Sequence, residues 1–155
     1  MVFDRDMTPA QIAAVEETMR VVDLDVVAAD FYRRAFEADA EVAALFTTDP
    51  AVQRRLFARE LRTIVGSIRE LDTFCAEAAA LGARHHDYGV RAVDYRTMGS
   101  ALLASLAAAR GSAWTPEVEE AWALAYNLIA EAMLTGALEP REAGRPAPRR
   151  AGDDH

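Results

Sequence analysis

The sequence contains no lysine and only three histidines, so arginine supplies its permanent positive charge. The 17 arginines are outnumbered by 25 acidic residues, which gives a formal net charge of −8. An acidic domain is repelled by polyanions and by anionic lipid surfaces. We therefore expect no nucleic-acid partner and no membrane partner.

Cysteine is nearly absent, and long uncharged runs are missing. The single Cys75 excludes an intrachain disulfide, and its plainest role is that of a small buried apolar side chain. The longest uncharged run spans residues 97–109, which is shorter than the roughly 20 residues of a membrane-spanning helix. The N-terminus also lacks the basic-then-apolar layout of a signal peptide. These absences predict a cytoplasmic protein.

Glycine and proline are few, at 8 and 6 of 155 residues, while 52% of the residues are hydrophobic, with many alanines and leucines. This composition favours an all-α domain over a turn-rich β fold. The usual enzyme motifs are missing as well: there is no HExxH, CxxC or GxSxG, no glycine-rich phosphate loop and no EF-hand pattern. The length fits one domain with room for one sizeable ligand.

Local signals mark where the helices start. Thr8, Pro9 and Gln11 form a capping-box sequence, and the pairs Asp49-Pro50 and Thr115-Pro116 are further start signals. We expect helices near residues 9–22, 24–37, 50–70, 72–86 and 94–109, a short segment ending at residue 46, and a last helix from residue 116. After residue 138 the chain becomes rich in proline and arginine. This change predicts a folded domain over 1–138 and a flexible tail over 139–155.

Two of the three histidines, His85 and His86, are neighbours in the segment LGARHHDYGV. They cannot face the same ligand, because consecutive helical side chains point about 100° apart. Steps of four and three back from His85 meet only apolar residues, whereas the same steps from His86 reach glycine, alanine, Cys75 and finally Asp72. His85 is therefore predicted to face inward and His86 to lie at the edge.

An inward histidine is either a core residue with a hydrogen-bond partner or a metal ligand. The apolar residues that precede His85 on its helix face, called the apolar stripe below, do not distinguish between these two roles. A four-ligand zinc site is excluded here, since Cys75 and His86 lie on another face. A metal held by His85 would have to arrive with its own ligands, as iron does in haem.

The order of several features resembles the globin family, in particular bacterial haemoglobins related to the globin half of flavohaemoglobins. The resemblance covers roughly residues 8–138 and implies helices packed three over three around one haem. It rests on the following features in register: Phe31-Tyr32, Phe46, Gln53, LGARHHDYGV at 81–90, Tyr95, MGSALL at 98–103 and WTPEVEEAWALAY at 114–126.

On the proximal side the resemblance implies that His85, which follows a basic residue, is the iron ligand, with Leu81 and Val90 as haem contacts. Tyr95 matches a tyrosine that in flavohaemoglobins joins a last-helix glutamate in hydrogen bonding around the proximal histidine. This sequence has Ala137 in place of that glutamate. A carboxylate that accepts a hydrogen bond from a metal ligand makes that ligand more electron-donating, so its loss weakens the expectation of strong O–O activation.

On the distal side the resemblance implies that Phe46 wedges the haem. It also implies that Tyr32 and Gln53 meet the gas ligand, with Phe57 one turn beyond Gln53. Taken alone, each has a plainer interpretation: the phenylalanines as core residues, Tyr32 as a packing tyrosine with a solvated hydroxyl, and Gln53 as a polar residue at a helix start. The spacing of these residues taken together favours a distal haem pocket.

The resemblance thus implies a haem b protein that binds dioxygen reversibly, and also NO and CO, as a carrier, store or sensor. Residues 50–70 contain no histidine, so we expect five-coordinate ferrous iron. The alternative is a nitric oxide dioxygenase, in which Tyr32, Gln53 and Tyr95 serve catalysis and a separate flavin-dependent reductase restores ferrous iron. A haem-free regulatory module is a third interpretation, against which His85 and Phe46 argue. A monomer and a homodimer are both compatible with the sequence.

Overall fold

The computed structural model describes residues 7–87 and 89–138, and within these ranges it contains helices and no strand. The predicted tail, 139–155, lies outside the described residues, so the domain boundary stays a prediction. The all-α class is confirmed. The elements in chain order are α1 (Pro9–Val21), α2 (Leu24–Ala38), α3 (Ala40–Ala43), α4 (Pro50–Gly66), α5 (Leu71–Asp87), α6 (Asp94–Arg110), a 3-10 turn η2 (Gly111–Ala113) and α7 (Pro116–Leu138).

The predicted start signals act as expected. The Thr8 side chain accepts a hydrogen bond from the backbone N–H of Gln11, while the Gln11 side chain accepts one from the backbone N–H of Thr8. Asp49 caps α4 by accepting from a backbone N–H at 2.8 Å, and Thr115 does the same for α7 at 3.2 Å. Each cap satisfies an N–H group that the helix leaves unpaired.

Two helix ends differ from prediction. The helix expected to reach residue 70 ends at Gly66. The hydroxyl of Ser67 lies 2.9 Å from the carbonyl oxygen of Ile64 and 2.7 Å from a carboxylate oxygen of Glu77 in α5, so its single hydrogen is shared between a backbone and a side-chain acceptor. A serine that bonds nearby backbone competes with helix continuation. The short segment ending at Phe46 is helical only over α3, and the rest is turn and loop.

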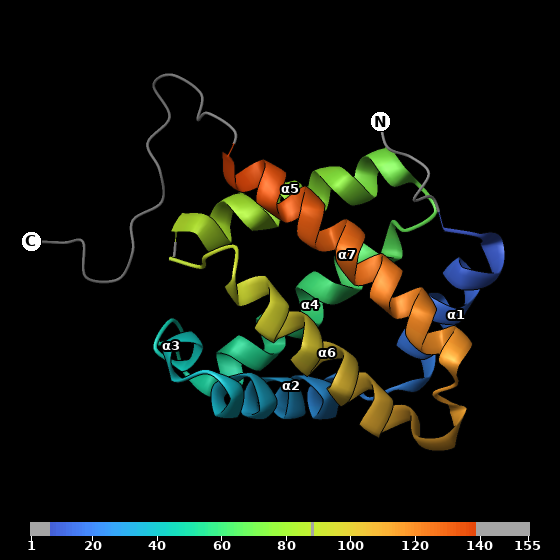
Figure 1. The fold of residues 1–155 in the computed structure, drawn as a ribbon, viewed down its shortest axis with the longest axis horizontal. Helices are drawn as coiled ribbons and strands as arrows, with labels where there is room; N and C mark the ends of the chain where they lie inside the picture. The colour runs from blue at the N-terminus through green and yellow to red at the C-terminus, as the bar shows by residue number, and fades with distance from the viewer. Residues whose placement is uncertain (1–6, 88, 139–155) are drawn as a thin grey trace, which may run out of the picture.

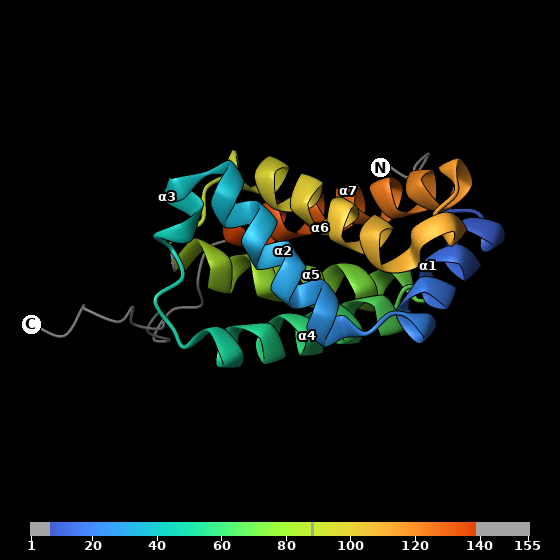
Figure 2. The same cartoon turned by 90° about the horizontal axis from the view of Figure 1, so that it is seen from below.

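The helices form two layers, the three-over-three arrangement expected of a globin. In Figure 2, α4 and α5 lie in one layer and α6 and α7 in the other, with α2 crossing between them on the near side. Figure 1 shows α5 passing behind α7, and the two helices are extensively packed against each other. Further contacts join α2 to α6 and α1 to α7.

The core between these layers contains Trp122, Phe74 and Leu106 as its largest fully buried side chains. By length and composition alone, α7 is the one helix of the described residues that could cross a membrane. The length of the uncharged runs in the sequence does not indicate α7, because a membrane-spanning helix tolerates an isolated charge. In the structure, α7 instead packs through Trp122, Ile129 and Met133 into the core.

Candidate functional site

Five aromatic rings gather where α2, α4 and the loop after α3 meet. Tyr32 is central: its ring centroid lies 5.0 Å from that of Phe31, 5.3 Å from Phe46 and 5.8 Å from Phe57. Phe36 lies 5.5 Å from Phe46, and Phe31 stacks on Phe57 at 4.6 Å. We call these five residues the aromatic cluster. It brings together three of the predicted distal residues.

The hydroxyl of Tyr32 is the polar group of this cluster. It donates to the backbone carbonyl of Gln53 at 3.4 Å, a long contact compared with the roughly 2.7–2.8 Å typical of hydroxyl donors. Burial raises the pKa of Tyr32 to about 12, so the hydroxyl keeps its proton at neutral pH. Tyr32 is thus a weakly engaged proton donor in apolar surroundings.

Gln53 joins this site through its main chain. The resemblance implies that Gln53 meets the gas ligand, and in the structure the Tyr32 hydroxyl contacts the Gln53 backbone carbonyl. The Gln53 side chain itself is half-buried. Its direct role in meeting a ligand stays a prediction.

His85 lies near the C-terminal end of α5 and is half-buried, whereas His86 is exposed, as the stripe predicts. Nδ1 of His85 lies 3.0 Å from the backbone oxygen of Leu81. A carbonyl only accepts, so Nδ1 carries the hydrogen and Nε2 of the neutral ring keeps a free lone pair. Burial, the largest effect, lowers the pKa of His85 and outweighs the Leu81 carbonyl, which raises it. The imidazole is therefore neutral and able to bind a metal through Nε2.

Among residues 7–87 and 89–138, no group of three or more His, Cys, Asp and Glu side chains could hold a metal ion. His85 therefore fits a metal that brings its other ligands, and haem is such a group. The surroundings agree with this choice, since Leu81 and Val90, the predicted contacts beside His85, are half-buried and pack against the core. Phe46 and Phe57 are half-buried in the same way.

Tyr95 lies in α6, and its part in the surroundings of the proximal histidine stays a prediction. Its side chain is buried in α6, but the hydrogen-bond partner of His85 is the carbonyl of Leu81 and not Tyr95. The backbone oxygen of Tyr95 accepts from the Tyr126 hydroxyl of α7 at 2.6 Å. Burial, and secondarily the charge of Asp94, raises the pKa of Tyr95 to about 12. Ala137, at the expected glutamate position, is half-buried near the end of α7.

A charged network that the sequence reasoning missed ties the segment after His85 to α3. The carboxylate of Asp94, only 1% exposed, accepts from the backbone N–H of Arg91 at 2.8 Å and from its guanidinium at 2.9 Å. Arg91 also pairs with Glu41 of α3 at 3.1 Å. We call Arg91, Asp94 and Glu41 the brace around Arg91. The sequence signal for it is an acidic residue in the first turn of a helix, three residues after an arginine.

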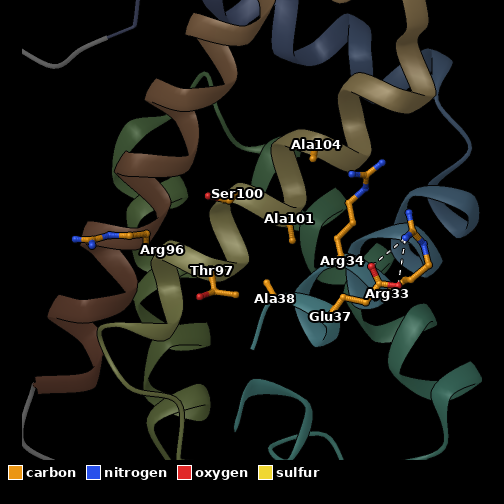
Figure 3. A pocket seen from close by; sticks show the side chains of 9 residues that line it. All are labelled: Arg33, Arg34, Glu37, Ala38, Arg96, Thr97, Ser100, Ala101 and Ala104. Carbon is orange, nitrogen blue, oxygen red and sulfur yellow. Dashed lines mark hydrogen bonds and ion pairs between the residues drawn. The ribbon is translucent and has the colours of Figure 1, made fainter. Parts of the chain in front are cut away.

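A groove of about 540 Å³ lies between α2 and α6 and contains none of the predicted site residues (Figure 3). Its lining includes small side chains such as Ala101 and Ala104, and two of its three arginines pair with acidic residues. Arg33 pairs with Glu37 at 3.3 Å, and Arg34 pairs with Asp30 at 2.9 Å. It is an open surface groove, and His85 and the aromatic cluster remain the candidate site.

The sequence profile of the globin family, described simply as Globin, matches residues 29–133, more than half of the chain. The chain belongs to the globin family. The matched range contains the aromatic cluster, Gln53, His85 and Tyr95. The globin fold is a haem-binding and oxygen-binding fold, and small gases are its characteristic ligands.

Curated relatives of this globin are flavohemoproteins. The flavohemoprotein of Rhizobium meliloti is 31% identical over 104 residues, which is 65% of this globin and 26% of that protein. The flavohemoprotein of Rhodopirellula baltica is 27% identical over 145 residues, 84% of this globin and 36% of that protein. This globin therefore spans about a third or less of the length of these relatives.

Solved structures resemble this globin in fold at low sequence identity. Deoxy haemoglobin from Dasyatis akajei has a TM-score of 0.70 and 18% identity, covering 84% of this globin and 97% of that chain. A hexacoordinated haem protein from an anhydrobiotic tardigrade has a TM-score of 0.78 and 14% identity, covering 89% of this globin and 100% of that chain. These likenesses support the fold alone.

Proposed function

We propose that this globin holds haem b through Nε2 of His85 and binds dioxygen reversibly, with Tyr32 as the distal hydrogen-bond donor. The observation that carries the proposal is the state of His85: it is half-buried, its Nδ1 is committed to the Leu81 carbonyl, and its Nε2 is left as an acceptor. The family match supplies the haem-binding fold.

When bound, haem supplies an iron that takes up diatomic gases. The protein's own residues decide how firmly a gas is kept. Tyr32 donates a hydrogen bond to a polarised ligand such as dioxygen, and its contact with Gln53 is long enough to be given up readily. The phenylalanines of the aromatic cluster exclude water from around that hydroxyl, which strengthens a charge-assisted bond.

The absence of histidine from α4 supports a five-coordinate ferrous state. Ultraviolet–visible spectra of the purified protein in ferric, ferrous and oxygenated forms test the proposal. We expect a Soret band, a five-coordinate ferrous spectrum and an oxygenated spectrum that reverts when oxygen is removed. A ferrous spectrum with two strong axial ligands would contradict the coordination, and no Soret band even after adding haemin would favour a haem-free module.

A second candidate is nitric oxide dioxygenase activity with a flavin-dependent reductase as electron donor. The flavohemoprotein relatives favour it. The proximal side favours reversible binding instead, because His85 bonds a neutral carbonyl and Ala137 replaces the expected carboxylate. The deciding assay is NO consumption with a generic flavin reductase. Sustained turnover supports the dioxygenase, whereas a single stoichiometric burst supports the binder.

A further inference from the structure

Helices α5 and α7 cross with their backbones in direct contact. A Cβ atom added at Gly82 would lie 2.0 Å from the backbone oxygen of Met133, and one added at Gly136 would lie 2.0 Å from the backbone oxygen of Ala79. Both distances are far below the 3.0 Å that real Cβ contacts respect. Each glycine thus faces the main chain of the opposite helix, so rotating a side chain cannot relieve a substitution.

Two other helical glycines show how specific this crossing is. A Cβ at Gly99 of α6 would meet the ring of Tyr126 at 2.5 Å, but a side chain can move where a backbone cannot. A Cβ at Gly66, the last residue of α4, would meet nothing within 4 Å. Gly82 and Gly136 are therefore required by contact between helix backbones.

The crossing lies directly beside the hydrogen bond of His85. Leu81, whose carbonyl accepts from Nδ1, immediately precedes Gly82, and His85 follows three residues later on the same helix. A helix moves as a stiff unit over one turn, so the contact that fixes residue 82 also fixes the acceptor and the imidazole. On the other side of the crossing, Gly136 of α7 touches the backbone of α5 at Ala79.

We propose that Gly82 and Gly136 are positioning residues for His85: the close crossing of α5 on α7 sets where the imidazole presents Nε2 to iron. This inference rests on the proposed haem function. A methyl group at either position must push α5 away from α7 by more than an ångström, because the added Cβ would lie 2.0 Å from a backbone oxygen and ordinary contact begins at 3.4 Å. His85 and its Leu81 acceptor move with the helix, which changes the iron–imidazole bond.

The test compares Gly82→Ala and Gly136→Ala with two matched controls in the full chain loaded with haemin. Gly99→Ala overpacks a buried contact away from α5, and Gly66→Ala adds a methyl to open space. Alanine favours helix more than glycine, so a loss cannot come from helix propensity. Resonance Raman spectroscopy of the ferrous proteins gives the iron–histidine stretching frequency, and transfer to an excess of apomyoglobin gives the haemin dissociation rate.

We expect Gly82→Ala and Gly136→Ala each to shift the iron–histidine band and to release haemin about tenfold faster or more. We expect both controls to keep the wild-type band, even if Gly99→Ala lowers thermal stability. The wild-type band and dissociation rate in Gly82→Ala would overturn the positioning role while leaving the haem function intact. A wild-type protein that takes up no haemin would overturn both proposals.

A measurement on the unsubstituted protein covers the case in which both variants fail to fold. In the haem-loaded wild type, amide hydrogens of residues 81–85 and those of α7 around residue 133 should exchange through the same opening, with matching protection factors. Residues 81–85 exchanging through their own, more frequent opening while α7 stays closed would show that the crossing does not hold His85, and would overturn the proposal.

Discussion

Removing a single hydroxyl from the aromatic cluster should speed oxygen release. The Tyr32 hydroxyl would give up only a 3.4 Å contact to the Gln53 carbonyl on turning to a ligand. A hydrogen bond with charge-assisted character contributes about 1.5–3 kcal/mol. Tyr32→Phe should therefore raise the dioxygen dissociation rate about 10- to 150-fold.

Stopped-flow displacement of dioxygen measures this rate, and carbon monoxide serves as the control ligand because it is much less polarised. We expect the carbon monoxide rate of Tyr32→Phe to change by no more than about threefold, since a weak hydrogen bond contributes little. Tyr126→Phe is the matched control variant. It removes a hydroxyl that donates to the Tyr95 carbonyl at 2.6 Å, away from the aromatic cluster, and should leave both gas rates unchanged.

The result that refutes this reasoning is an oxygen dissociation rate in Tyr32→Phe within about twofold of the wild type, in protein that still binds haem. Equal acceleration for dioxygen and carbon monoxide would also refute it, because it would indicate a steric change in the pocket. Thermal stability distinguishes a damaged fold, since a 3.4 Å hydrogen bond in the cluster contributes no more than about 1 kcal/mol to folding.

Three further predictions concern stability and ligation. His85→Ala should abolish the five-coordinate ferrous spectrum and His86→Ala should keep it; the reverse pattern would show that His86 is the iron ligand. Burial raises the pKa of Asp94, but hydrogen bonds from Arg91 outweigh it and hold that pKa below its ordinary value, so the carboxylate stabilises the fold above about pH 4 and this contribution is lost as pH falls further. Asp94→Asn should cost about 1–3 kcal/mol in urea unfolding at pH 7 and progressively less below pH 4, and an equal cost at both pH values would contradict this. Removing haem should lower the melting temperature measured by circular dichroism, and adding haemin should restore it, because haem binds the folded state; identical melting curves would speak against a specific site.

The helical architecture was predictable from local signals because caps and periodicity act over a few residues. The capping box at Thr8 and the caps at Asp49 and Thr115 all form as predicted. The inward position of His85 followed from a stripe of apolar residues on one helix face, which needs no knowledge of the rest of the chain. The early end of α4 could not be predicted from local signals, because Ser67 hydrogen-bonds to Glu77 of another helix.

Contacts between helices distant in sequence lay beyond the sequence reasoning. Nothing local indicates that the Tyr32 hydroxyl meets the main chain of Gln53 or that the Tyr126 hydroxyl meets the main chain of Tyr95. The close crossing at Gly82 was not predicted either, although a glycine inside a helical pattern lowers helix stability and can mark a close packing contact. Which backbone it touches depends on the fold.

The brace around Arg91 has two halves that differ in their exposure to solvent ions. Its inner half ends on Asp94, 1% exposed, whereas its outer half joins two exposed side chains, Arg91 at 55% and Glu41 at 75%. At about 1 M salt the Debye length falls to about 3 Å, so the outer pair is screened while the inner one is little affected. Rising ionic strength should thus weaken the ion pair that ties Arg91 to α3, while buried Val42 keeps α3 packed on the core and the start of α6 stays fixed. The ion pair between α3 and the segment after His85 is therefore the salt-sensitive half of this network.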